Sequence, residues 1–307
     1  MTKLNILISG ATGFVASAVL QSTEHYFRRV VRDSNPHNSL NFFTLDSINS
    51  NTNWGSAFVG IDVVFHLAGL AHSNKYSISD YQEVNTNGTI HFATEAAKAG
   101  VKRFVFVSSI GVNGTVTHGQ PFTELDIPKP HNAYAMSKLH AEVGLKKIAD
   151  ETGLELVIVR PTLVYGPNAP GNFGSLTKLV QKFPFLPFGL SDNKRDFIAV
   201  QNLADLLLTC SNHPNAAGHT FLASDGETVS IKVFTNAIAK GLNKTLIQLP
   251  VPISLMRLGA RLVGKLSIAE QLLGNLQVDS SNAHEVLGWS PPYTMEQAMA
   301  SLSENKK

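Results

Sequence analysis

Short apolar runs alternate with amphipathic stretches through the first half of the chain. The apolar runs, rich in β-branched and aromatic residues, lie at 4–9, 27–31, 63–67, 101–108 and 154–160. Stretches with helical spacing of their apolar positions lie at 11–22, 81–99 and 132–152, and Gly153 is a suitable stop for the last of them. This alternation predicts βαβ units, and therefore an α/β fold with a doubly wound parallel sheet and helices on both of its faces.

The amino-acid composition of the chain changes after Pro161. The segments "PTLVYGPNAPGNFG" and "KFPFLPFGLSDN" are rich in proline, glycine and phenylalanine, as is typical of loops between shorter elements. We expect a first domain over 1–163, to which later segments at about 195–212 return, and a smaller, partly interleaved C-terminal domain over 164–307. The second domain should pack over the carboxyl ends of the strands, where open α/β sheets bind their ligands.

The composition narrows the function classes. With 43% hydrophobic and 16% charged residues and a formal net charge of +2, the chain lacks the excess of basic residues that is typical of nucleic-acid-binding proteins. The single cysteine, Cys210, lies in an apolar helical run and is expected to be a buried small hydrophobe. The chain reaches a glycine turn too early for a signal-peptide core, and no apolar run approaches the roughly 18 residues that span a bilayer. These features predict a cytoplasmic protein without membrane insertion.

A glycine turn follows the first predicted strand in "NILISGATGFVASAV". Gly10 would permit a tight turn and Gly13 a close approach of the backbone to phosphates, while Ala16 stands where a third glycine would allow close helix packing. The helix that follows offers unpaired N–H groups and a partial positive charge, which suit a pyrophosphate. Taken alone, the fragment fits a dinucleotide site and an ordinary glycine turn about equally well.

A second signal is "YAMSK", in which Tyr134 and Lys138 are four residues apart on a predicted helix. This spacing puts the phenol and the ammonium on one face, and a nearby cation favours the phenolate that general acid–base chemistry needs. Ser108 and Ser109 end a predicted strand, where a hydroxyl could bind the same substrate oxygen. Alone, Tyr134 and Lys138 are an ordinary amphipathic pair; with the glycine turn and the serines, they indicate a catalytic site.

Together these motifs resemble the extended short-chain dehydrogenase/reductases, specifically the nucleotide-sugar epimerase/dehydratase group with its Rossmann-type fold. The resemblance covers nearly the whole chain, through "GATGFVA", "VVFHLAG", "YQEVNTNGT", "VFVSSIGVNG", "YAMSK", "RPTLVYGP" and "RDFIAVQNLADLL". The segments "LPFG", "HPNAAGHTFLASDGETVS" and "LLGNLQVDSSNAHEVLGWSPP" are most similar to a subgroup associated with bacterial surface polysaccharides. Its members are UDP-glucose 4-epimerase-like or reduce UDP-4-keto-6-deoxy-N-acetylhexosamines.

The resemblance implies roles for individual residues. Ser109, Tyr134 and Lys138 would be catalytic, with Lys138 lowering the pKa of Tyr134 and holding the nicotinamide ribose. Arg195 would neutralise the substrate diphosphate and Asn172 would contact its phosphate or sugar, with Ser109 as the third substrate contact. The alternatives are that Arg195 pairs with Asp192 or Asp196 and that Asn172 is a turn residue. The implied cofactor-binding residues are Gly10, Thr12, Gly13, Phe14, Val15, Arg32, Asp46, Leu67, Ala68, Gly69, Asn85, Tyr134, Lys138 and Pro161.

Three positions depart from the family pattern. Dehydratases of the family carry an acidic pair directly after the catalytic serine or threonine, whereas Ile110 and Gly111 follow Ser109, which argues against 4,6-dehydration. Asn113 replaces an aromatic residue beside the site, which leaves the shape of the sugar pocket open. Arg32, at the end of the second strand, favours the 2′-phosphate of NADP(H), but Asp33 could serve NAD if the strand runs one residue further.

These observations predict an NAD(P)-dependent enzyme that acts at C4 of a UDP-sugar, by 4-keto reduction or by C4 epimerisation, in bacterial surface polysaccharide synthesis. The alternative is a non-catalytic, dinucleotide-sensing regulatory protein on the same fold. We expect a UDP-sugar partner, no nucleic-acid partner and no metal site, and leave a homodimer open. Eleven histidines form no zinc-like cluster, and His66, His91 and His140 are expected to be packed or surface residues.

A basic stripe is the remaining feature. Arg257, Arg261 and Lys265 stand at i+4 spacing opposite a set of leucines, Leu255, Leu258, Leu262 and Leu266. We expect a solvated polar face on a helix whose apolar side covers the substrate domain, with contact to an anionic membrane surface as the alternative. Phe183, Phe185 and Phe188 could equally wall the substrate pocket or pack in the core.

Overall fold

The centre of the protein is a seven-stranded parallel sheet in the order β3–β2–β1–β4–β5–β6–β10. It is seen in a computed structural model that describes residues 3–32, 41–71 and 75–304. The strands are β1 (Asn5–Ser9), β2 (Tyr26–Arg32), β3 (Phe42–Leu45), β4 (Val63–His66), β5 (Arg103–Val107), β6 (Glu155–Pro161) and β10 (Thr220–Ala223). This sheet confirms the predicted Rossmann-type fold, whose strand order reverses beside β1.

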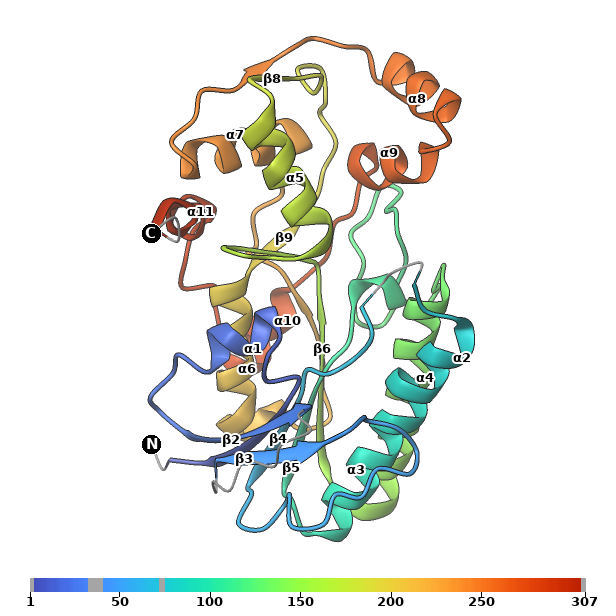
Figure 1. The fold of residues 1–307 in the computed structure, drawn as a ribbon, viewed down its shortest axis with the longest axis vertical. Coiled ribbons are helices and arrows are strands. Elements are labelled where there is room, and N and C mark those ends of the chain that lie inside the picture. The colour runs from blue at the N-terminus through green and yellow to red at the C-terminus, as the bar shows by residue number, and fades with distance from the viewer. Residues whose placement is uncertain (1–2, 33–40, 72–74, 305–307) are drawn as a thin grey trace.

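Helices cover both faces of this sheet, as Figure 1 shows. The helical elements of the first half are α1 (Phe14–Val19), α2 (Ile78–Tyr81), the π-helical turn η1 (Gln82–Asn87), α3 (Gly88–Lys98), the 3₁₀ turn η2 (Ile110–Val112) and α4 (Ala133–Thr152). The predicted helix at 11–22 is shorter because the glycine turn occupies its start. The predicted helix at 81–99 begins earlier and contains the π-helical turn. Strand β3 was not predicted, since a four-residue run gives little periodicity.

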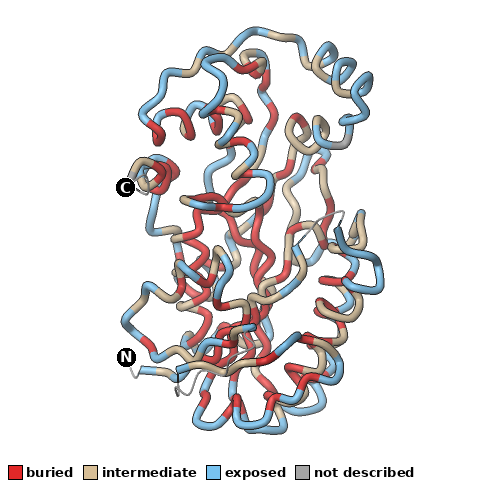
Figure 2. Tube along the Cα trace, in the orientation of Figure 1, coloured by how far each residue is buried: buried red, intermediate tan, exposed pale blue. Residues whose placement is uncertain are grey.

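The alternation of side chains along β1 explains the two apolar layers around the sheet. Ile6 and Ile8 belong to a core that also contains residues of α1 and α6, whereas Leu7 belongs to a core that contains residues of α3 and α4. Figure 2 shows the buried positions concentrated along the strands. Both faces of a parallel sheet are covered in this way, which accounts for the nearly continuous apolar strands in the sequence.

The chain after β6 builds a second group of elements above the carboxyl ends of the strands (Figure 1). They are β7 (Leu163–Tyr165), α5 (Gly171–Lys182), β8 (Phe185–Leu186), β9 (Phe197–Ala199), α7 (Ile231–Gly241), β11 (Ile247–Gln248), α8 (Ile253–Leu262), α9 (Leu266–Leu273) and α11 (Met295–Glu304). The remaining elements, α6 (Val200–Asn212), η3 (Pro214–Ala216) and α10 (Ser281–Leu287), pack against the main sheet. Strand β7 pairs with β9, and β8 with β11, both in parallel. Phe188 is buried in the core of this group, whereas Phe183 and Phe185 are exposed.

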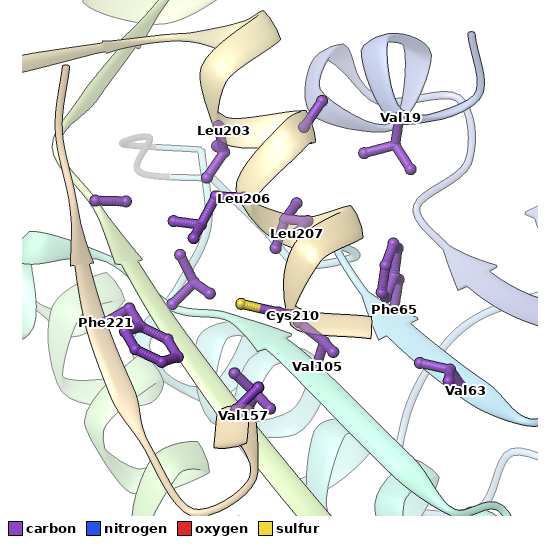
Figure 3. Packing of buried hydrophobic residues seen from close by; sticks show 14 of the residues in the cluster. Val19, Val63, Phe65, Val105, Val157, Leu203, Leu206, Leu207, Cys210 and Phe221 are labelled. Atoms are coloured by element: carbon purple, nitrogen blue, oxygen red, sulfur yellow. The ribbon is translucent and has the colours of Figure 1, made fainter. Parts of the chain in front are cut away.

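Several later segments pack onto the main sheet. Helix α6 contributes Leu203, Leu206 and Cys210 to the core beside α1, as Figure 3 shows, and β10 extends the sheet beyond β6. Cys210 is fully buried, as predicted, and burial raises the pKa of its thiol to about 12. The division into two domains at residue 163 stays a prediction. None of the helices in the described parts of the chain is long and apolar enough to cross a membrane.

Candidate active site

The turn after β1 is shaped by a close backbone approach. Gly10 has a φ of +70°, and its carbonyl accepts a hydrogen bond of 2.8 Å from the N–H of Gly13. A Cβ at Gly10 would lie 2.8 Å from the amide nitrogen of Ala68, in the loop after β4. Gly13 then caps α1 without a side-chain hydrogen bond, and it is exposed together with Thr12. The turn therefore offers bare backbone at the switch point of the sheet, which fits a pyrophosphate.

A buried histidine ties the loop after β4 to the sheet. His66 Nδ1 lies 2.6 Å from Ser9 Oγ, and its Nε2 lies 2.7 Å from Thr89 Oγ1 on α3. Burial lowers the pKa of His66 well below its usual value, and the charge of Lys138 lowers it further. Ser9 Oγ also accepts a hydrogen bond of 3.3 Å from the N–H of Ala68. A neutral imidazole thus joins β1, β4 and α3 directly under the glycine turn, as expected for a packed histidine.

Asn85 joins the same loop to the helix of the tyrosine motif. Its side chain accepts from the N–H of Leu70 at 2.7 Å and donates to the carbonyl of Leu70 at 3.1 Å and to Ser137 Oγ at 3.1 Å. A Cβ at Gly69 would lie 3.1 Å from Asn85 Oδ1 and 3.4 Å from Lys138 Nζ. The structure therefore brings Gly69, Asn85 and Lys138 together, as the family resemblance implies.

Ser109 meets Tyr134 at the start of α4. Asn132 caps this helix, with its Oδ1 accepting from the N–H of Ala135 at 2.8 Å. A side-chain hydrogen bond joins Ser109 and Tyr134, and it lowers the phenol pKa, but burial has the larger effect and raises that pKa to about 12. The ring of Tyr81 stands edge-on to Tyr134 with 6.2 Å between centroids. The phenol is therefore protonated at neutral pH and ready to donate a proton.

Lys138 lies behind the tyrosine. Its Nζ donates to the carbonyl of Val107 at 3.0 Å and lies 4.7 Å from the centre of the Phe106 ring. Burial lowers the pKa of Lys138 to about 8, and the charge of Glu142 opposes this shift. The sequence predicted that Lys138 would lower the pKa of Tyr134. In the protein alone, burial of the phenol has the larger effect and raises that pKa, and the effect of Lys138 on Tyr134 stays a prediction.

A buried polar chain lies on the far side of Lys138. Glu142 accepts hydrogen bonds from Ser108 Oγ at 2.5 Å and from Arg160 Nε at 2.9 Å. Arg160 Nη1 also donates to Asn113 Oδ1 at 2.9 Å, and Asn113 Nδ2 donates to the carbonyl of Thr123 at 2.8 Å. The sequence left the role of Asn113 open; its buried amide serves this chain. Ser108 is used there too, which leaves Ser109 as the serine that reaches Tyr134.

Two candidate cofactor residues end neighbouring strands. Arg32 is the last residue of β2 and pairs in register with Leu45, so Arg32 and Asp46 are both exposed at the carboxyl edge of the sheet. Asp33, the alternative contact, lies outside the described residues. Of the remaining candidates, Leu67 and Val15 are partly buried. Pro161 is buried and pairs with Ala223 of β10, and Phe14 lies against Gly166.

Arg195 is placed by the second group of elements. Its Nη1 donates to the carbonyl of Gly274 at 2.8 Å, and burial lowers its pKa to about 10. Among the described salt bridges Arg195 pairs with neither Asp192 nor Asp196, but the charge of Asp196 opposes the lowering of the Arg195 pKa. Asp196 accepts hydrogen bonds from Thr228 Oγ1 and from the N–H of Val278. The role of Arg195 toward a diphosphate stays a prediction.

Asn172 lies in the first turn of α5 and is exposed. A cavity of about 510 Å³ beside this turn is lined mainly by residues 166–178, and Asn172, Ser109, Tyr134 and Lys138 are not among its lining residues. The role of Asn172 in substrate binding stays a prediction.

The sequence reasoning missed two supporting residues. Tyr81 contacts Tyr134, and Glu142 continues the spacing of four residues that begins with Tyr134 and Lys138. The second could have been found, because a carboxylate at the next i+4 position on the same helix face is an evident partner for a buried cation. Across residues 3–32, 41–71 and 75–304, no group of three or more histidine, cysteine, aspartate or glutamate side chains could hold a metal ion.

Comparison with protein families gives one match that spans most of the chain. Residues 6–224 match the model of the NAD dependent epimerase/dehydratase family. The chain is 40% identical over 310 positions to a UDP-glucose 4-epimerase from Vibrio cholerae, covering 98% of this chain and 94% of that protein.

Solved structures of the same fold are also similar. UDP-glucuronic acid 4-epimerase from Bacillus cereus, in complex with NAD, has a TM-score of 0.76 at 18% identity and covers 98% of this chain and 96% of its own. RMD from Pseudomonas aeruginosa, complexed with NADPH, has a TM-score of 0.72 at 20% identity and covers 98% of each chain. At these identities the likeness concerns the fold. The neighbours carry either nicotinamide cofactor.

Proposed function

The chain belongs to the NAD dependent epimerase/dehydratase family, and on that premise we propose that it is a UDP-sugar 4-epimerase. The observation that carries the proposal is the hydrogen-bonded pair Ser109–Tyr134, with Lys138 one turn further along the same helix. These are the groups that proton transfer at a sugar hydroxyl requires. The 40% identity to a UDP-glucose 4-epimerase over nearly the whole chain supports the same reaction.

In the proposed reaction, the phenolate form of Tyr134 removes the proton of the 4-hydroxyl, and after the sugar has turned it returns that proton to the 4-keto oxygen. The positive charge of a bound oxidised nicotinamide would favour this phenolate over the protonated phenol of the protein alone. A bound nicotinamide supplies the acceptor and donor of the C4 hydride. Ser109 holds the 4-oxygen by hydrogen bonding in both half-reactions. Lys138 holds the nicotinamide ribose, and Arg195 neutralises the diphosphate so that the sugar can turn while the nucleotide stays bound.

The proposed cofactor contacts follow the edge of the sheet. The turn from Gly10 to Gly13 would hold the pyrophosphate, where a Cβ at Gly10 has no room. Asn85, Gly69 and Lys138 would hold the nicotinamide ribose. These residues fit a dinucleotide, because the loop after β4 and the turn after β1 meet within van der Waals distance at the strand-order reversal.

A second candidate function is 4-keto reduction of a UDP-4-keto-6-deoxy-N-acetylhexosamine in bacterial surface polysaccharide synthesis. It uses the same residues, with Tyr134 delivering the proton to the 4-keto oxygen. Arg32 favours this candidate, since a guanidinium at the end of β2 suits the 2′-phosphate of NADPH, a cofactor that a reductase consumes. Dehydration is disfavoured, because Ile110 and Gly111 supply no carboxylate beside Ser109.

The experiment is a panel of UDP-sugars and their 4-keto derivatives, assayed with NADH and NADPH. Epimerisation predicts interconversion of a UDP-sugar pair without net cofactor consumption, and nucleotide released on denaturation. Stoichiometric oxidation of NADPH by a 4-keto sugar would favour the reductase instead. Arg32→Gln should then weaken NADPH binding and leave NADH binding unchanged.

Tyr134→Phe tests the site itself. Removing the phenol oxygen should lower turnover by roughly 10²- to 10⁴-fold, because one general acid–base group is lost. Tyr26→Phe is the matched control, since Tyr26 is exposed at the start of β2. A Tyr134→Phe protein with full turnover would refute the assignment. A wild-type protein that binds the dinucleotide but turns over no member of the panel would favour the regulatory alternative.

A further inference from the structure

Helix α8 carries a leucine stripe that faces away from the protein. Leu255, Leu258 and Leu262 are 56%, 54% and 80% exposed, although their spacing of three and four residues puts them on one helix face. Ile253 and Met256, on the opposite face, pack against the core of the second group of elements. The sequence predicted that these leucines would cover the substrate domain. That expectation is wrong, because the helix has two apolar faces and the one with Ile253 and Met256 packs against the protein.

The stripe continues into neighbouring exposed apolar side chains. Val263, Leu266 and Ile268 are 67%, 38% and 52% exposed just beyond α8. On the other side, the paired strands β8 and β11 expose Phe185 and Ile247, which are partners in register. Figure 1 shows β8 and α8 along the same end of the molecule, the end furthest from the main sheet. We call this region, β8, β11 and α8 with residues 263–268, the apolar tip.

Cations outnumber carboxylates around the apolar tip. Residues 228–269 contain six lysines and arginines and no aspartate or glutamate, in a chain whose net charge is only +2. Arg257 pairs with Glu270, but Arg261 and Lys265, one turn apart beside the leucines, form no ion pair with any described residue. The tip therefore combines an outward apolar stripe with unneutralised cations.

We propose that the apolar tip docks onto the surface of a lipid bilayer that contains anionic lipid. Amphipathic helices that lie in a membrane interface combine an apolar face with flanking lysine and arginine, and each cation near an anionic surface adds to binding. A second copy of the chain is a poorer occupant. A two-fold contact through α8 would bring Arg261 and Lys265 of one copy close to the cations of the other, and Glu270, the carboxylate that follows residues 228–269, is already paired with Arg257.

The test is flotation of the full-length protein with vesicles of phosphatidylcholine alone and of phosphatidylcholine mixed with phosphatidylglycerol. We expect the protein to float with the mixed vesicles only, and less at raised ionic strength. Arg261→Gln with Lys265→Gln should weaken binding roughly 30-fold, because each basic residue contributes about 1 kcal/mol near an anionic surface. Leu258→Gln with Leu262→Gln should weaken it at least about 10-fold, through lost apolar contact.

Matched controls separate the tip from general surface effects. Lys146→Gln with Lys147→Gln removes two exposed cations from α4, and Val59→Gln removes an exposed apolar side chain from the sheet region. Both control variants should float like the wild type. All variants should keep wild-type turnover of the free UDP-sugar, so a failure of docking is distinct from a failure of the proposed function.

Three outcomes would overturn the docking proposal. One is flotation with neither vesicle, and another is equal flotation with both. The third is self-association by light scattering that the leucine variants abolish, which would identify a second copy as the occupant.

Discussion

Glu142 lies one helical turn beyond Lys138 and forms a buried ion pair with Arg160, whose Nη2 lies 2.5 Å from Glu142 Oε2. The two side chains are 2% and 4% exposed, so neither charge can be solvated if its partner is lost. The pair joins α4 to β6 beneath the serine and tyrosine. It explains why two charged residues occupy the core so close to the candidate site.

Removing this carboxylate charge should be strongly destabilising. We expect Glu142→Gln to lower the free energy of unfolding by about 3–5 kcal/mol, because Arg160 is left buried without a counter-charge. Urea unfolding measures the loss. The control is Glu151→Gln on the same helix, whose carboxylate lies 3.8 Å from Lys147 in an exposed pair and should contribute at most about 1 kcal/mol. Similar losses in both variants would contradict a structural role for the buried pair.

The glycine turn can be tested against a glycine of the same backbone conformation. Gly10 and Gly60 have φ angles of +70° and +71°, but a Cβ at Gly60 meets nothing within 4 Å. We expect Gly60→Ala to cost about 1–2 kcal/mol for the left-handed backbone alone. Gly10→Ala should cost more and should also weaken nicotinamide cofactor binding in a titration. Unchanged cofactor affinity in Gly10→Ala would argue against a phosphate site at this turn.

His66 should make stability fall in mild acid. Its pKa is lowered in the folded protein, so as the pH falls below about 6.5 the unfolded chain takes up a proton that the folded protein does not. Stability is therefore lost as the pH drops, by up to about 2 kcal/mol between pH 6.5 and pH 5. The free energy of unfolding, measured with urea at each pH, should change less across this range for His66→Gln than for the wild type. His284→Gln, at an exposed position of α10, should keep the wild-type slope.

Arg195 should affect substrate binding more than chemistry. A hydrogen bond to a charged group contributes about 1.5–3 kcal/mol, so Arg195→Gln should raise the KM for a UDP-sugar by roughly 10- to 150-fold with little change in kcat. Arg28→Gln is the control, because this residue of β2 also donates from its guanidinium to backbone carbonyls, those of Ala57 and Val59, and is not a candidate site residue. A fall in kcat at unchanged KM would exclude the proposed role.

The sequence by itself determined the parallel α/β sheet and indicated the candidate catalytic residues. Strand and helix periods depend on residues close in the chain, and the glycine turn, Ser109 and the spacing of Tyr134 and Lys138 are local patterns of this kind. The predicted strands at 4–9, 63–67 and 154–160 differ from β1, β4 and β6 by a residue or two at their ends. The burial of Cys210 was likewise predictable from the apolar residues that surround it in the sequence.

Only the tertiary structure decided which side chains meet across long distances in the chain. Asn113 and Arg160 are 47 residues apart, and nothing local pairs them. Burial raises the pKa of Tyr134, which is opposite to the effect expected of Lys138. The degree of burial depends on every side chain packed around the phenol. The same holds for α8: periodicity gave its amphipathic pattern, but which face lies against the protein depends on neighbours that the helix itself does not encode.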